Sequence, residues 1–206
     1  EFLEALNQHF SEYPYLLGWK PSIGDFGLIA PLYAHLGRDP APLRIMQQRA
    51  VRVARWVERM NRADQDVPEF FNPGNNYLED DRIPETLVTV LRVLAEDLVP
   101  ETQAAAEVIN QWLAENQPEP GTSAQGLLAD RMFGMAQFSL RGQAISAVAQ
   151  SYRFVVLQKL QQQYAQLGAA QQQDVTNLLQ RCGLEVLLTV SLDRQLGWAE
   201  NQDIWL

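Results

Sequence analysis

The sequence predicts an all-α protein, a multi-helix bundle formed by a single domain of 206 residues. Two observations lead to this fold class. Apolar residues recur at steps of three and four over most of the chain, which is the period of an amphipathic helix. Paired segments that alternate apolar and polar residues around a hairpin turn are not evident, so the sequence predicts no sheet.

Helical periodicity is clear in the middle of the chain. Between residues 43 and 60 the apolar positions that share one helical face are Met46, Ala50, Val53, Val57 and Met60. Pro84 suits the first turn of a second helix, in which leucines follow at the same spacing. Pro100 restarts this pattern, which then continues to Trp112.

The last third of the chain is also predicted to be helical. Residues 116–126 contain two prolines and two glycines and are predicted to be a loop. Apolar residues then predict the longest helix, with Ile145, Val148, Tyr152, Val156, Leu160 and Tyr164 along its buried face. A shorter amphipathic helix ends at Cys182, before Gly183. Residues 184–192 suit a strand or a helix, and we assign a helix because a lone strand would have no partner.

One segment interrupts the helical pattern. Residues 62–82 are rich in Asp, Pro, Gly and Asn. We interpret them as a connector inside one domain, between core helices in residues 1–61 and a helical extension in residues 83–206.

Composition excludes several classes of protein. The net charge is −9 and the pI is about 4.7, which argues against nucleic-acid binding because that depends on many contacts from Lys and Arg to phosphates. No apolar run approaches the roughly 20 residues that span a bilayer, so we expect no membrane partner. The single cysteine, Cys182, fits a reducing compartment, and we expect a cytoplasmic protein. The chain lacks an initiator Met, so we expect a fragment of a longer protein.

The most informative stretch is Tyr13–Leu28. Ser22 is followed three residues later by Asp25, the spacing of a capping box in its acidic form. The Ser22 hydroxyl can accept a hydrogen bond from a backbone N–H of the first helical turn, and the Asp25 carboxylate can reach back to the Ser22 N–H. The carboxylate also suits the positive end of the helix dipole.

This stretch resembles the helix-capping motif in the C-terminal helical domain of the glutathione transferase superfamily. The matching residues are Leu16, Leu17, Gly18, Ser22, Asp25 and Phe26. The segments Gly27–Asp39 and Arg52–Met60 are similar to bacterial members with an extended helical C-terminus. The resemblance covers residues 2–61 at the level of motifs, and from Pro84 onward it is a likeness in helix pattern.

The resemblance implies a structural role for Ser22 and Asp25, which serve folding in this family. It also implies that the glutathione site and the catalytic residue lie in a preceding thioredoxin-like domain, and nothing in this chain resembles that domain. We therefore expect no catalytic, cofactor-binding or metal-binding residue here. The resemblance implies that the chain contributes to an apolar substrate pocket in an intact parent, expected to be a glutathione transferase, without being catalytic alone. The alternative is a non-catalytic helical module that binds other proteins.

Several residue types that often carry chemistry have a simpler interpretation. Arg52, Arg55, Arg59 and Arg62 form a basic stripe that could bind an anion or a partner, although a solvated helix face is the favoured interpretation. His9 is interpreted as a packed histidine. His35 and Asp39 lie four residues apart, but two ligands do not make a zinc site. Cys182 is interpreted as a buried structural thiol.

The missing domain leads to a prediction about partners. The helix that begins near Ile23 is apolar on nearly all sides and is expected to need extensive burial. We expect self-association through this helix together with Phe2, Leu6 and Phe10, or coverage by the missing thioredoxin-like domain.

Overall fold

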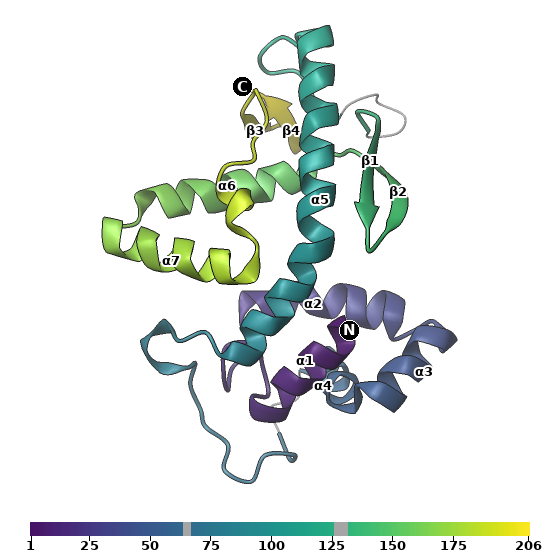
Figure 1. The fold of residues 1–206 in the computed structure, drawn as a ribbon, viewed down its shortest axis with the longest axis vertical. Coiled ribbons are helices and arrows are strands. Elements are labelled where there is room, and N and C mark those ends of the chain that lie inside the picture. The colour runs from purple at the N-terminus through teal and green to yellow at the C-terminus, as the bar shows by residue number, and fades with distance from the viewer. Residues whose placement is uncertain (64–66, 126–131) are drawn as a thin grey trace. The chain divides into compact units, whose positions relative to one another are not determined.

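The protein is represented by a computed structural model that describes all residues except 64–66 and 126–131 (Figure 1). The described chain divides into two compact units, residues 1–93 and 94–206. This division falls inside one long helix, α5 (Glu85–Asn116), and not in the predicted connector, residues 62–82. Each unit has a hydrophobic core of its own.

The first unit is helical. Its elements are α1 (Phe2–Glu12), α2 (Ile23–Pro31), the π-helical η1 (Leu32–Leu36), α3 (Pro40–Arg49), α4 (Val51–Arg62), the 3-10 turn η2 (Glu79–Asp81) and the first turns of α5. Its core gathers the apolar sides of α1, α4 and the start of α5. Phe10 of α1 stacks on Trp56 of α4 with ring centroids 5.2 Å apart, and both side chains are buried.

The second unit combines helices with two hairpins. Its elements are the rest of α5, β1 (Met135–Leu140), β2 (Gln143–Val148), α6 (Tyr152–Gln166), α7 (Ala169–Cys182), the 3-10 turn η3 (Glu185–Leu188), β3 (Leu196–Ala199) and β4 (Gln202–Trp205). An aromatic group formed by Trp112, Phe133 and Trp205 lies in its core. The core is therefore built by α5 together with segments from the C-terminal part of the chain.

The all-α prediction is wrong, because the second unit contains two antiparallel two-stranded sheets. In the first hairpin Phe138 pairs with Ile145 and Ala136 with Ala147, so one face carries the apolar side chains. The turn is Arg141–Gly142, with positive φ angles of 49° and 79°. Positive φ at both positions is the geometry of a tight type I′ hairpin, and glycine adopts it without strain.

The second hairpin has the same kind of turn at Glu200–Asn201, where φ is 50° and 61°. Its strands are only four residues long, too short for alternation to stand out in the sequence. In the first hairpin the four-residue steps that continue from Ile145 into α6 mimic one long helix. The helical prediction for residues 145–164 is therefore wrong over β2, and the strands β3 and β4 have no counterpart in the sequence prediction.

Helix boundaries differ from the prediction at three points. The apolar run from 43 to 60 is broken at Ala50, whose extended φ of −141° ends α3 and precedes α4. The predicted restart at Pro100 does not occur, because α5 continues through this proline. In residues 184–192 the structure has the short 3-10 turn η3 rather than an α-helix.

The apolar faces are only partly as predicted. Leu6 and Phe10 are buried in the core of the first unit, so they are not available for contacts between chains. Ile23 and Phe26 of α2 remain 91% and 61% exposed. Tyr152, predicted to lie on a buried face, is 68% exposed. Among the described helices, none is both long enough and apolar enough to cross a membrane.

Candidate functional site beside Trp19

The start of α2 is fixed by the buried carboxylate of Asp25. Its Oδ2 accepts hydrogen bonds from the Ser22 N–H at 2.8 Å and from the Ser22 hydroxyl at 2.7 Å. Its Oδ1 accepts from the Leu16 N–H at 3.1 Å and from the Trp56 Nε1–H at 3.1 Å. The structure thus contains the capping box expected from the spacing, and the same carboxylate also binds the preceding turn and α4. A buried carboxylate needs such donors because it has lost its water.

The turn before α2 is paired with the predicted connector, residues 62–82. The Trp19 N–H donates to the Asn76 carbonyl at 3.0 Å, and the Leu78 N–H donates to the Leu17 carbonyl at 2.9 Å. Between these bonds lies Gly18, whose φ is 116° and whose added Cβ would lie 3.0 Å from the backbone N of Leu78. Glycine is therefore required here both by the backbone angle and by the close approach.

Trp19 occupies a defined place against this segment. A Cβ added to Gly74 would lie 2.5 Å from the Trp19 ring, so the indole packs directly on the Gly74 backbone. Phe70 meets the same indole edge-on, with ring centroids 5.3 Å apart. Two polar contacts also join the turn to this segment. Lys20 Nζ donates to Asn76 Oδ1 at 3.2 Å, and the Tyr77 hydroxyl donates to the Pro21 carbonyl at 3.0 Å.

Two hollows of the first unit share Trp19 as a wall. The Trp19 hollow has a volume of about 570 Å³, and its lining residues are Tyr15, Trp19, Lys20, Pro21, Phe26, Arg59, Met60, Ala63, Gly74 and Asn75. The connector hollow has a volume of about 730 Å³, and its lining residues are Trp19, Gly74, Asn75, Asn76, Tyr77, Leu78, Glu79, Asp80 and Arg82. Most side chains that define the first are apolar, whereas the second is mainly polar.

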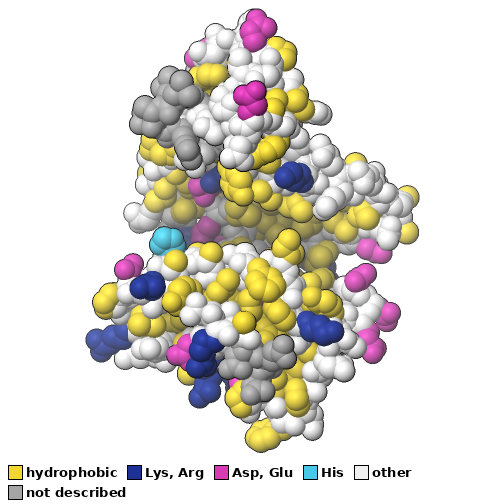
Figure 2. Space-filling view, turned by 180° about the vertical axis from the view of Figure 1, so that it is seen from behind, with side chains coloured by type: hydrophobic (Ala, Val, Ile, Leu, Met, Phe, Trp, Pro, Cys, Tyr) yellow, Lys and Arg dark blue, Asp and Glu magenta, His cyan; other side chains and the backbone are white. Residues whose placement is uncertain are grey.

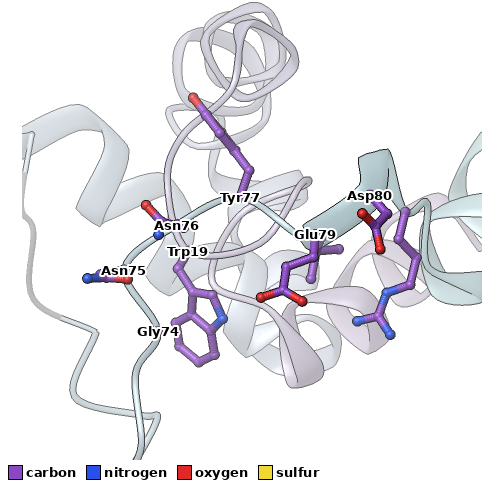
Figure 3. A pocket seen from close by; sticks show the side chains of 9 residues that line it. Trp19, Gly74, Asn75, Asn76, Tyr77, Glu79 and Asp80 are labelled. Atoms are coloured by element: carbon purple, nitrogen blue, oxygen red, sulfur yellow. The ribbon is translucent and has the colours of Figure 1, made fainter.

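Figure 3 shows how the polar side chains lie in the connector hollow. The side chain of Glu79 extends toward the side of the Trp19 indole, whereas those of Asn76 and Tyr77 point away from it. The amide and phenol groups therefore do not converge on a common point in this hollow. The Trp19 hollow is the better candidate for a small-molecule site, because such sites are mostly apolar with a few placed polar groups.

Arg59 is the polar residue most deeply set in the Trp19 hollow. It is 5% exposed, and its guanidinium lies over the Tyr15 ring at 5.2 Å from the centroid. Its Nη1 donates to Glu69 at 2.7 Å and its Nη2 donates to the Pro14 carbonyl at 2.8 Å. Its Nε–H is buried and has no hydrogen-bond partner. Arg59 is thus a buried charge that is paired on one side and unsatisfied at one donor.

This burial corrects the interpretation of the four arginines as one solvated stripe. Arg59 packs into the unit at the edge of the apolar face of α4, Arg52 is half-buried, and Arg55 and Arg62 are exposed. Figure 2 shows one face on which Lys and Arg side chains lie among apolar and acidic ones, several of them near one another at the lower left. Because Arg59 is buried and Arg52 is half-buried, the four arginines do not form one solvated stripe along α4.

The histidines have different surroundings. His9 is fully buried, with Nδ1 2.9 Å from the Thr86 hydroxyl and Nε2 3.3 Å from the Tyr15 carbonyl. Burial lowers the pKa of His9 below its ordinary value, because the protonated ring would lose its water. His35 and Asp39 are both exposed, and the Asp39 N–H donates to the His35 carbonyl at 3.2 Å. In the described part of the chain, no three His, Cys, Asp or Glu residues lie close enough to hold a metal ion.

Cys182 is fully buried at the end of α7, as expected for a structural thiol. Of the residues that line the Trp19 hollow, Phe26 and Arg59 are named from the sequence in other roles, but the hollow itself is not predicted. Trp19 and Lys20 fall inside the Tyr13–Leu28 stretch, but their partners at Gly74 and beyond lie more than 50 residues away. No protein-family model matches this chain, and no curated protein or solved structure matches it either.

Proposed function

We propose that this chain is the helical portion of a cytoplasmic, glutathione-transferase-like protein and that its Trp19 hollow binds an apolar, aromatic ligand. In the intact parent a thioredoxin-like domain would bind glutathione, and the chain alone would not conjugate it. The capping motif from Leu16 to Phe26 supports the family. The observation that carries the binding function is the 570 Å³ hollow with Tyr15, Trp19 and Met60 in its wall.

The dimensions and lining of the hollow fit this proposal. Small-molecule sites typically occupy about 300–1,000 Å³ and are lined mainly by apolar and aromatic side chains. An aromatic ligand can stack on an indole or a phenol, which contributes about 0.5–1.5 kcal/mol beyond the area buried. The site is also organised in advance, since the Gly74 backbone and the Phe70 ring pack against Trp19 and hold its indole in place.

The test uses N-phenyl-1-naphthylamine, an uncharged aromatic probe whose fluorescence rises in an apolar site. We expect saturable binding of one probe per chain, followed by titration and by calorimetry. Trp19→Ala removes the wall that stacks on the probe and is expected to weaken binding at least about tenfold, which corresponds to about 1.4 kcal/mol.

The matched control is Trp198→Ala, because Trp198 is a 65% exposed indole on β3 in the other unit. This control should bind the probe as the unmodified chain does. Absence of saturable binding, or equal affinities in the Trp19 and Trp198 variants, would rule out the proposed site.

A second candidate function is that of a module that binds other proteins. The observation that favours it is the exposure of Ile23 and Phe26, adjacent turns of α2 that a partner or a second copy of the chain could cover. Light scattering at micromolar concentration is expected to show association, and Ile23→Glu is expected to abolish it. If the chain is a monomer at all concentrations, self-association is ruled out, and the thioredoxin-like domain remains as the proposed cover of Ile23 and Phe26.

A further inference from the structure

We propose that the open edge of strand β2 is an interaction surface for a second copy of this chain. In this contact β2 pairs antiparallel with the β2 of the other copy, about a two-fold axis at Ser146. The contact lies in the second unit and involves neither the Trp19 hollow nor α2. Two features of β2 support it, namely backbone groups that have no partner and a sequence that is complementary to itself in the antiparallel direction.

The register of the first hairpin fixes the direction of its backbone groups. The two-residue turn Arg141–Gly142 makes Leu140 and Gln143 a hydrogen-bonded pair. Hydrogen-bonded and non-hydrogen-bonded pairs alternate from there along the two strands. At the far end the Ala149 N–H donates to the Gly134 carbonyl at 2.9 Å, as this alternation requires. The turn and the far end of the hairpin therefore give the same pattern.

Three residues of β2 have their backbone groups on the outer edge. Ala144, Ser146 and Val148 are at non-hydrogen-bonded positions, so their N–H and C=O groups point away from β1. All three residues are exposed. Within the described residues, no further strand pairs with this edge and no hydrogen bond from another segment reaches it. An open edge of this kind is a template for another strand.

The other hairpin of the same unit has both of its edges occupied. Residues 122–124 run beside β4, and the Trp205 N–H donates to the Thr122 carbonyl at 2.9 Å. On the β3 side the Gln158 amide binds both backbone groups of Leu196, with bonds of 3.0 and 2.8 Å to its N–H and carbonyl. β2 has no such cover, and it also contains no proline or charged side chain, the usual protections of an edge strand.

β2 is more exposed than β1. The residues that flank β1 contact α5, since Arg141 forms an ion pair with Asp97 at 3.2 Å and a Cβ added to Gly134 would lie 2.9 Å from Val108. The hairpin therefore stands beside α5 (Figure 1). Ala136 of β1 is buried, whereas no residue of β2 is.

The sequence of β2 favours a second copy as the occupant. In an antiparallel pair centred on Ser146, Ile145 lies opposite Ala147 of the other copy, and Val148 lies opposite Ala144. Each of these cross-strand pairs combines a β-branched side chain with a small one, and no like charges are opposed. Two identical strands paired in this way close as a two-fold dimer. Because the contact is short, and interfaces below about 1,200 Å² are typically weak or transient, we expect pairing only well above micromolar concentration.

The first test is a disulfide trap in the Ile23→Glu chain, so that α2 does not hold copies together. Cys182 is buried and does not compete. Opposite residues of a hydrogen-bonded antiparallel pair have Cα atoms about 5.5 Å apart, within the range of a disulfide. Under mild oxidation Ser146→Cys is expected to form covalent dimers at least about tenfold faster than Ala144→Cys, because pairing raises the effective concentration of its thiols.

Ala144→Cys is the matched control on the same edge. In the two-fold pairing its Cα atoms are about 14 Å apart, four residues along the strand, and cannot be bridged. Equal rates of dimer formation in the two variants, or a faster rate for Ala144→Cys, would overturn the proposal.

The second test measures amide hydrogen exchange by NMR in the Ile23→Glu chain without added cysteines. The outward amides of Ala144, Ser146 and Val148 should exchange more slowly as the chain is concentrated from micromolar to millimolar. The inward amides of Ile145 and Ala147 are bonded to β1 and should not change, which makes them an internal control. Ser146→Lys opposes two like charges at the two-fold axis and should remove the concentration dependence, while the inward amides stay protected. Outward amides that exchange at one rate at every concentration would overturn the proposal and leave the Trp19 hollow unaffected.

Discussion

Asp25→Ala is expected to destabilise the first unit far more than the loss of an ordinary helix cap. Removal of an N-cap side chain typically costs about 0.5–2 kcal/mol. Here the carboxylate also serves the Leu16 N–H and the Trp56 indole N–H, both at 3.1 Å, and Asp25 is fully buried. Each of these donors left without an acceptor costs about 1–3 kcal/mol. Because water can enter the space left by the carboxylate, we expect a total loss of about 3–5 kcal/mol.

The assay is urea unfolding followed by two signals. Circular dichroism reports all helices, and tryptophan fluorescence includes Trp56 in the core of the first unit. Because the chain has two compact units, unfolding is not assumed to be a single two-state transition. The transition seen by each signal is fitted separately. We expect the transition of the first unit to move to lower urea and that of the second unit to stay in place.

Asp39→Ala provides a matched control. Asp39 precedes α3 as its N-cap residue, but its side chain makes no capping hydrogen bond. Its removal is expected to cost less than about 1 kcal/mol, mainly through the helix dipole. If Asp25→Ala cost no more than Asp39→Ala, the two bonds from Leu16 and Trp56 would have no net effect on stability, and the reasoning would fail.

Two further predictions concern buried titratable groups. The lowered pKa of His9 means that the unfolded chain binds more protons, so the unfolding free energy should fall as pH drops from about 6.5 to the folded pKa. His9→Gln is expected to flatten this fall in urea midpoints measured from pH 8 to pH 5. Burial raises the pKa of Asp203 above its ordinary value, and its Oδ1 has no hydrogen-bond partner. The unfolding free energy should therefore fall as pH rises from the ordinary pKa of an aspartate to the higher pKa of Asp203 in the folded chain. Asp203→Asn should therefore be more stable than the parent at pH 7, and equal or lower stability would contradict this account.

The helices could be predicted from the sequence where one face is apolar over several turns. The spacing from Met46 to Met60 predicts one helical face where the structure has two helices, α3 and α4, and the break at Ala50 depends on a backbone angle that no spacing encodes. The hairpins could not be predicted in this way. Their turns at Arg141–Gly142 and Glu200–Asn201 lack the usual Asn-Gly or Asp-Gly signal, although the glycine after Arg141 was a clue to the first.

In the candidate site, too, local contacts could be predicted from the sequence and long-range contacts could not. Ser22 and Asp25 are three residues apart, so their local bond follows from the spacing alone. The hydrogen bond from Trp56 to Asp25 joins residues 31 positions apart, and no local sequence pattern predicts it. The Trp19 hollow depends on pairing between the turn before α2 and the segment near Asn76, neither of which has a helical period. Such segments are shaped by tertiary contacts, and they are also where binding residues commonly lie.

The hydrogen bonds of Asp25 connect the stability of the first unit with the Trp19 hollow. Leu16, which donates to Asp25, follows Tyr15 directly, and Trp56 lies one turn before Arg59 and Met60 on α4. The Asp25 carboxylate therefore binds next to two parts of the lining, Tyr15 on the turn and Arg59 with Met60 on α4.

Ser22→Ala tests this connection, because it removes the hydroxyl, with its bond to Asp25 Oδ2 and its part in the capping box, while leaving the carboxylate in place, and it should cost about 1 kcal/mol. The variant is expected to remain folded but to bind N-phenyl-1-naphthylamine a few-fold more weakly, whereas Asp39→Ala should bind the probe normally. Unchanged affinity in Ser22→Ala, despite a measurable loss of stability, would show that the cap stabilises α2 without positioning the hollow.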